Sequence, residues 1–210
     1  MAQEHSRPQE PKGSRLFDLE YQLLQYASHH DNPVNKVIHL TCIPLILWSA
    51  LVFAAKTGPL LPTPTTSKLR AKLFETFPTN AGTLAMAAYC AYYIKLDKVA
   101  GLLTTPLFMG AAKHATHFNA ANPNATKVAG LVHIFAWIAQ FIGHGVYEKR
   151  APKLTENLVQ ALVLAPYFVV YEVLFSLGYR PQLRATLNTL VEADIREWKA
   201  KKALQSNKRQ

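Results

Sequence analysis

Long apolar stretches alternate with short polar segments along the chain. Residues 37–55, 128–147 and 158–179 are 19, 20 and 22 residues long, and Glu172 is the only formal charge among them. A helix rises about 1.5 Å per residue, so roughly 20 apolar residues cross the hydrocarbon core of a bilayer. A soluble helical bundle is the alternative, but its helices show a polar face at every turn, and residues 37–55 do not. The pattern therefore predicts membrane-spanning helices.

Two further apolar stretches are shorter. Residues 81–94 and 99–112 are separated by Lys95, Asp97 and Lys98. They predict either tilted spans or a hairpin that enters the bilayer only partway. With them, we expect an all-α fold: an integral membrane helical bundle with four to five hydrophobic helices and flexible polar tails. The number of crossings stays open.

The remaining segments are polar. Residues 1–15 and 199–210 have almost nothing to bury, and they predict a disordered tail and a basic tail. Residues 56–80 contain several Pro, Thr and Ser and predict a loop. Between the tails, residues 16–198 predict a single helical membrane domain. The first apolar run begins late and lacks a small-residue cleavage pattern, so we expect no signal peptide.

Composition and charge narrow the possible partners. The chain is 50% apolar and only 17% charged, which excludes disorder for most of its length. Its formal net charge is +10, but no basic stripe is interleaved with aromatic residues. We therefore expect membrane lipids with anionic headgroups as partners, and no nucleic acid. Residues 180–210 hold eight Lys or Arg against three acids, which favours a cytosolic C-terminus. Cys42 and Cys90 lie in apolar runs and are interpreted as packing residues.

Seven of the eight histidines lie outside the tails. Ionisable side chains at membrane depth are costly, so they indicate functional sites. Pro33 ends a helix near His30, and Asn35 then stands where the next helix would have its N-cap. His39 follows one turn later. A helix–turn–helix corner can therefore bring His30 and His39 to one point at the membrane surface; helix capping and hydrogen bonding to headgroups are the alternative.

A polar stripe follows one face of the helix predicted for residues 128–147. Spacings of 4, 3 and 4 residues place four side chains on this face: His133, Trp137, Gln140 and His144. Glu148 extends the stripe by one turn. Such a stripe must face other helices or a cavity. We interpret His133 and Gln140 as parts of a hydrogen-bonded helix seam.

His144 is interpreted differently, because Gly143 and Gly145 on either side allow a close approach to the backbone. His114 and His117 are three residues apart, a plausible but common spacing of metal ligands. Several neutral imidazoles near an interface favour iron, zinc, copper or nickel. Calcium and magnesium would need oxygen clusters, and a zinc finger would need a Cys pair. Composition and spacing thus predict a membrane-embedded histidine metal site.

A family resemblance goes further than spacing. It rests on residues 157–168 and on two motifs, His30-Asp-Asn-Pro-Val-Asn35-Lys-Val-Ile-His39-Leu-Thr-Cys-Ile-Pro44 and Trp137-Ile-Ala-Gln140-Phe-Ile-Gly143-His144-Gly-Val-Tyr-Glu148-Lys-Arg150-Ala-Pro152. These residues resemble the endoplasmic-reticulum 2-hydroxy fatty acid dioxygenase family of fungi, plants and bacteria. The resemblance covers most of residues 16–188.

The resemblance implies an iron(II)-dependent (Fe2+) dioxygenase of fatty acid α-oxidation that acts in phytosphingosine degradation. A 2-hydroxy long-chain fatty acid and O2 would give a fatty acid one carbon shorter. The location implied is the endoplasmic reticulum membrane, crossed several times. The metal ligands implied are His30, His39, His114 and His144, with His29 as an alternative to His30. His117 and His133 do not match the family pattern, which favours structural roles for them.

Glu148 and Arg150 are candidates for catalysis, and Lys36 and Lys149 are alternatives to Arg150. Glu148 can be a ligand, a base or a partner that orients His144, and orientation is our interpretation. Arg150, Lys36 or Lys149 can steer the carboxylate of the substrate. The apolar helices would hold the acyl chain, which explains why such an enzyme lies in a membrane.

Three other hypotheses stay open. A di-iron lipid hydroxylase or desaturase would hold two irons in repeated histidine boxes. A non-enzymatic membrane scaffold or lipid-binding protein would use its histidines only to cap helices and would hold no stoichiometric metal. A haem protein with two axial histidines would show a Soret band. The sequence does not indicate oligomeric state, protein partners or the chain length of the substrate.

Overall fold

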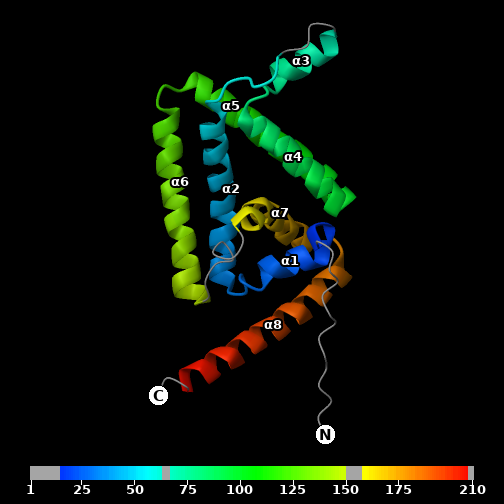
Figure 1. The fold of residues 1–210 in the computed structure, drawn as a ribbon, viewed down its shortest axis with the longest axis vertical. Helices are drawn as coiled ribbons and strands as arrows, with labels where there is room; N and C mark the ends of the chain where they lie inside the picture. Colours follow the sequence, from blue (N-terminus) through cyan, green and yellow to red (C-terminus); the bar gives the residue numbers. More distant parts are fainter. Residues whose placement is uncertain (1–14, 63–66, 150–157, 208–210) are drawn as a thin grey trace.

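The computed structural model describes residues 15–62, 67–149 and 158–207, which form helices and turns without any strand (Figure 1). In chain order the elements are η1 (Arg15–Phe17), α1 (Leu19–Ala27), α2 (Pro33–Ala55), α3 (Lys68–Thr76), α4 (Ala81–Leu96), α5 (Lys98–Ala121), α6 (Ala125–Ile142), the π-helix η2 (Gly143–Glu148), α7 (Leu158–Ser176) and α8 (Pro181–Asn207). The predicted all-α class is confirmed. Predictions for residues 1–14, Arg150 and residues 208–210 fall outside the described residues.

The longest apolar helices form the centre of the molecule. Among the described residues, Pro33–Ala55 and Ala125–Glu148 are long and apolar enough to cross a membrane. α2 and α6 lie side by side (Figure 1). α7 and α8 are bent by 118° at their junction, and they add a third candidate span only if the bent pair is counted as one span rather than as a re-entrant loop. α4 has only 16 residues, so not every hydrophobic helix of the predicted bundle is long enough to cross.

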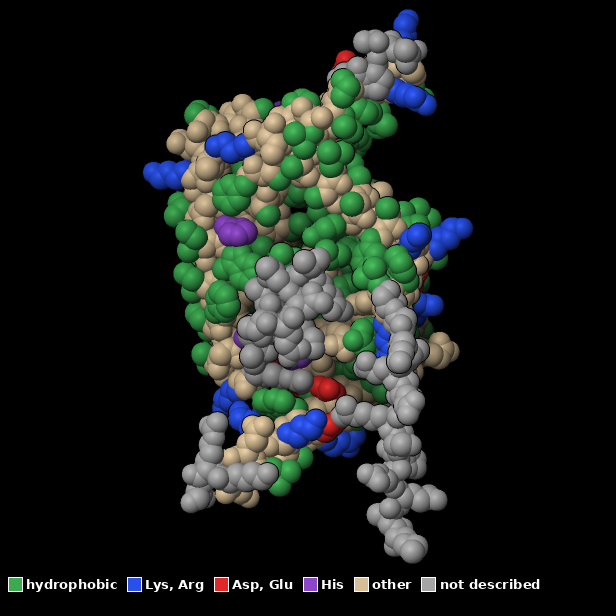
Figure 2. All heavy atoms as spheres, in the orientation of Figure 1, with side chains coloured by type: hydrophobic (Ala, Val, Ile, Leu, Met, Phe, Trp, Pro, Cys, Tyr) green, Lys and Arg blue, Asp and Glu red, His purple; other side chains and the backbone are tan. Residues whose placement is uncertain are grey.

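α6 turns an apolar face outward. Leu131, Phe135 and Ile138 on this helix are each more than half exposed. Figure 2 shows apolar side chains along the flank that α6 forms. A soluble bundle would turn polar side chains to this side, whereas lipid chains match an apolar surface. The face therefore favours the membrane protein over the soluble alternative.

The corner between α1 and α2 differs from its predicted capping. α1 ends at Ala27, and Asn32, not Asn35, is the N-cap of α2. The Oδ1 atom of Asn32 accepts hydrogen bonds from the N–H groups of Val34 at 2.9 Å and Asn35 at 3.3 Å. Pro33 explains the difference, because proline favours the first helical position and holds the preceding residue in an extended conformation. Asn35 is thereby left inside the helix, with its side chain free for another contact.

A single carboxylate ties the α4–α5 junction to the α7–α8 junction. Asp97 caps α5 by accepting hydrogen bonds from the N–H groups of Val99 and Ala100. The same carboxylate accepts a hydrogen bond from the hydroxyl of Tyr171 at 2.7 Å and forms an ion pair with Arg180 at 3.0 Å. The two helix pairs are thus held together at one end of the bundle.

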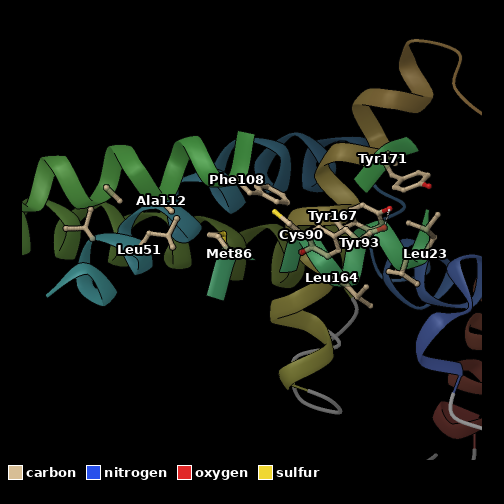
Figure 3. Close-up of a cluster of buried hydrophobic side chains, with 14 of the residues drawn as sticks. Leu23, Leu51, Met86, Cys90, Tyr93, Phe108, Ala112, Leu164, Tyr167 and Tyr171 are labelled. Atoms are coloured by element: carbon tan, nitrogen blue, oxygen red, sulfur yellow. Dashed lines mark hydrogen bonds between the residues drawn. The ribbon is translucent and has the colours of Figure 1, made fainter. Parts of the chain in front are cut away.

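The main apolar core combines buried residues of α4, α5 and α7 with others from α1, α2, α6 and α8. The rings of Tyr93 and Tyr167 are stacked at its centre, with centroids 4.2 Å apart and planes within 7° (Figure 3). The hydroxyl of Tyr93 donates to the carbonyl of Val163, and that of Tyr167 to the carbonyl of Tyr93. Cys90 is buried in this core, and Cys42 is buried on α2. Both thiols are free and buried, and the burial agrees with the predicted packing role.

Two segments expected to be irregular are helical. α3 lies within the predicted loop 56–80 and is capped by Ser67. α8 continues to Asn207 through most of the predicted basic tail. Its end is rich in Ala, Lys, Leu and Gln, which favour helices, and Lys201 pairs with Glu197 one turn earlier at 2.7 Å. Because the last residues of the chain include few apolar side chains, we expected them to be disordered. Their high helix propensity makes them helical nevertheless.

Candidate metal and substrate site

Three histidines from different segments meet near the beginning of α2. His30 follows α1, His39 lies in the second turn of α2, and His144 lies in η2. One ring nitrogen of each lies within 4.8 Å of those of the other two. All three side chains are buried, at 3%, 2% and 5% exposure. In the described part of the chain, no other group of three His, Cys, Asp or Glu side chains is placed to hold a metal ion.

Backbone hydrogen bonds orient two of the rings. Nδ1 of His30 donates to the carbonyl of Tyr26 at 2.8 Å, and Nδ1 of His39 to the carbonyl of Asn35 at 2.9 Å. Because a carbonyl only accepts, the proton lies on Nδ1, and Nε2 keeps its lone pair. Nε2 of His30 and Nδ1 of His144 are buried without a hydrogen-bond partner. A buried imidazole that donates one ring N–H to a carbonyl and keeps a lone pair on the other nitrogen is typical of a ligand to a transition-metal ion.

Aromatic packing fixes the ring of His30. The ring of Tyr26 is stacked on it with centroids 4.0 Å apart, and Phe168 of α7 lies 4.2 Å from Tyr26. Burial, and secondly the neighbouring His39, lower the pKa of His30 well below its ordinary value. His30 is therefore neutral at pH 7, the state in which imidazole binds a metal.

Glu148 fastens the end of η2 to the α1–α2 corner. Its carboxylate accepts hydrogen bonds from the N–H groups of Asp31 at 3.0 Å and Asn32 at 3.1 Å, and from Nδ2 of Asn35 at 3.0 Å. Lys149 follows with a left-handed φ of 54° and ends the π-helix. Glu148 thus contacts the segment that carries His30, rather than the ring of His144 that we expected it to orient.

Asn35 of α2 and Gly143 of η2 lie close together. Asn35 is fully buried, and its Oδ1 atom has no hydrogen-bond partner. A Cβ atom at Gly143 would overlap with this oxygen, whereas a Cβ at Gly145 would meet nothing within 4 Å. Of the two glycines beside His144, only Gly143 therefore permits a close approach. Sequence reasoning missed Asn35 as the residue that is approached, although its place one turn before His39 was a signal.

The structure does not bring His114 into the histidine group. It lies exposed on α5, and its Nδ1 accepts a hydrogen bond from the indole of Trp48 at 3.0 Å. His133 lies in a seam, as predicted: Nδ1 is 2.8 Å from the hydroxyl of Ser49, and Nε2 accepts from the indole of Trp137 at 2.9 Å. Neither ring belongs to the group formed by His30, His39 and His144.

The other predicted residues are not members of the group. His29 is buried beside His30 but is not a member of the group. Lys36 is half-buried and lines a separate pocket between α1, α7 and α8, and Lys149 is exposed. His117 is exposed on α5. Arg150 falls outside the described residues, so its position relative to the histidines stays a prediction.

A cavity of about 210 Å³ extends from the three histidines between α2, α6 and α7. Its walls are mainly apolar: Ile43, Ile46, Leu47, Ala50, Trp137, Phe141, Leu162, Ala165 and Pro166, with Tyr26 and Tyr89. Gln140 also lines it, which corrects the seam interpretation, because its Nε2 has no hydrogen-bond partner. A chain-shaped apolar ligand with a polar head would fit a cavity of this composition.

The sequence relationships agree with this site. Residues 16–177 match the family described as 2-hydroxy-palmitic acid dioxygenase Mpo1-like. The chain belongs to the Mpo1-like family. It is 37% identical over 177 residues to the 2-hydroxy-palmitic acid dioxygenase MPO1 of Saccharomyces cerevisiae, an alignment that covers 83% of this chain and 90% of the yeast protein. No solved structure matches the chain. The Mpo1-like span includes the three clustered histidines and every residue of the cavity wall.

Proposed function

We propose that this chain is an iron(II)-dependent dioxygenase that converts a 2-hydroxy long-chain fatty acid and O2 into a fatty acid one carbon shorter. The observation that carries the proposal is the group of three buried histidines at one end of an apolar cavity. Membership of the Mpo1-like family and the name of the yeast relative support the substrate class. The reaction would belong to fatty acid α-oxidation and phytosphingosine degradation.

The residue roles follow from the site. His30, His39 and His144 would hold the iron, and three protein ligands leave positions open for other molecules. When bound, iron(II) supplies the redox chemistry between the substrate and dioxygen. The overall change balances if the 2-hydroxy acid and O2 give the shorter acid, carbon dioxide and water. The cavity walls exclude water and hold the acyl chain, Glu148 positions the corner beside His30, and Arg150 would steer the carboxylate.

We also propose a location and orientation. The two candidate spans support residence in a membrane, and we place the chain in the endoplasmic reticulum as a multi-pass protein. The eight basic and three acidic residues after position 179 support a cytosolic C-terminus. The basic residues of α8 would then lie near anionic lipid headgroups.

The test is a single-turnover assay on detergent-purified protein. Protein loaded with iron(II) is mixed with O2 and 2-hydroxyhexadecanoic acid, and pentadecanoic acid is measured by mass spectrometry. We expect His39→Ala to lose bound iron and to lower product formation by at least about 100-fold, because even residues that only orient a ligand contribute up to that much. His114→Ala is the matched control and should keep both.

Other outcomes separate the alternatives. Iron-loaded wild-type protein that forms no shortened acid would contradict the proposal. Two irons per chain would favour the di-iron hydroxylase or desaturase class, and intact protein without stoichiometric metal would favour the scaffold. The single histidine group among the described residues favours one metal ion over two.

A further inference from the structure

Gln140 presents an unused hydrogen-bond donor to the cavity. It lies on α6 one turn before His144, on the side that faces α2. Its side chain is only 8% exposed and lines the cavity together with His39 and His144. Its Nε2 atom is buried and has no hydrogen-bond partner. A buried donor without a partner destabilises the folded state, so such a group indicates a missing acceptor.

The surroundings show which kind of acceptor is missing. The histidine rings offer lone pairs to a metal ion, but an amide N–H cannot bind a cation. The indole of Trp137, the other N–H donor on this stretch of α6, already donates to His133. Beyond Gln140 the cavity wall is apolar along Ile43 and Leu47. The acceptor must therefore belong to a ligand whose polar end lies beside the histidines.

We propose that the side-chain amide of Gln140 donates a hydrogen bond to the carboxylate of the fatty acid bound in the cavity. The inference rests on the proposed function and adds a binding residue to it. A carboxylate is the strongest acceptor that a fatty acid offers, and a hydrogen bond to a charged acceptor is stronger than one between neutral groups. In this arrangement the head of the acid lies between the histidines and Gln140, and the acyl chain extends past Ile43 and Leu47.

The test compares ligands that differ in their head groups. Gln140→Leu removes the donor at similar volume, and Gln182→Leu, the same change at an exposed position of α8, is the control. Dissociation constants are measured by equilibrium binding of radiolabelled hexadecanoate, 2-hydroxyhexadecanoate and 1-hexadecanol to the purified full-length protein. We expect Gln140→Leu to weaken both acids about 10- to 100-fold and to leave hexadecanol unchanged. Its unfolding temperature should stay equal or rise, because an unpartnered donor is removed.

Two results would overturn the inference: unchanged affinity for both acids, or an equal loss for hexadecanol, which would indicate a change in cavity shape alone. If Gln140→Leu does not fold, Gln140→Glu keeps the shape and replaces the donor, and it should show the same selective loss for the acids. Wild-type protein that binds the acids without shortening 2-hydroxyhexadecanoate would contradict the proposed function while leaving the Gln140 contact testable. Wild-type activity with unchanged acid binding in the variants would contradict only the contact.

Discussion

Glu148 reaches from the end of η2 to the corner that carries His30. Glu148→Ala leaves two backbone N–H groups and the amide of Asn35 without their acceptor. We expect a loss of about 1–3 kcal/mol in the free energy of unfolding. Because the corner also sets the position of His30, metal affinity should fall by about 10- to 100-fold. Thermal unfolding and metal titration of the purified protein measure the two effects.

A graded control accompanies this prediction. Glu148→Gln keeps one carbonyl oxygen as an acceptor, so both its unfolding temperature and its metal affinity should lie between those of wild type and Glu148→Ala. Metal affinity equal to wild type in both variants would show that the corner holds His30 without this carboxylate.

For individual residues, the sequence predicted part of the site and missed part of it. Proline chemistry predicted a corner between His30 and His39, and helical spacing placed Gln140 and His144 on one face. Spacing could not exclude His114, because the partner of its ring, Trp48, lies 66 residues away on another helix. The length of the corner and the rotation of one helix against another are set by tertiary packing, which a local pattern does not contain.

At the level of the helices, the contact between α2 and η2 depends on the missing side chain of Gly143. Gly143→Ala would push a methyl group onto Oδ1 of buried Asn35. Overpacking of this kind costs about 1–3 kcal/mol, and we expect the unfolding temperature and the metal affinity to fall together. Gly145→Ala is the matched control, since its Cβ would meet nothing within 4 Å and alanine favours helices. A neutral Gly143→Ala would mean that α2 and η2 can separate without loss.

Asp97 makes the joining of the two helix pairs sensitive to acid. Burial alone would raise its pKa, but hydrogen bonds from Tyr171, Ala100 and Tyr179 and the charge of Arg180 outweigh burial and hold its pKa below the ordinary value. A carboxyl with a lowered pKa in the folded state stabilises the protein above the unfolded-state pKa, about 4. This contribution is lost as the pH falls through the lower pKa of the folded state.

Asp97→Asn tests this dependence. At about pH 6 the variant should unfold at a lower temperature than wild type, because the charge that attracts Arg180 and strengthens the tyrosine hydrogen bonds is gone. At about pH 3 the difference should shrink, since the unfolded wild-type chain then binds a proton at this carboxyl more readily than the folded protein, whose Asp97 has the lower pKa. The comparison uses melting curves of both proteins in one detergent, and a difference that does not change with pH would contradict the assignment.

The length of an apolar run predicted a helix correctly, whereas a polar composition did not predict a loop or a disordered tail correctly. The runs at 37–55 and 128–147 form α2 and α6 with its π-helical end. A run of 19 or 20 apolar residues that is buried or surrounded by lipid needs a continuous helix, because only a helix pairs all of its backbone polar groups internally. α3 and the end of α8 contradict the expected loop and tail, since good helix formers fold without a buried face when capped or paired. The π-helix itself had no local signal beyond the two glycines around His144.

In the whole molecule, the bundle places His30, His39, His144 and Gln140 in the lining of an otherwise mainly apolar cavity. One face of α6 is apolar and exposed, as a surface that contacts lipid would be, while the opposite side of the same helix supplies Gln140 to the cavity. A substrate that is mostly hydrocarbon can then enter from the membrane, and only its head meets the histidines. The cavity therefore predicts how acyl chain length is selected.

Ala50 lines the cavity eleven residues beyond His39, which is about 16 Å along α2. Ala50→Phe should fill the far end and expel the last methylenes of a long chain. Each buried methylene contributes about 0.8 kcal/mol, so losing two or three raises the KM for 2-hydroxyhexadecanoate roughly 15- to 60-fold. The KM for 2-hydroxydecanoate should stay unchanged, because its shorter chain ends before the new ring. Ile138→Phe, on the outward face of α6, is the control and should alter neither value. Equal effects of Ala50→Phe on both acids would show that the chain does not follow α2.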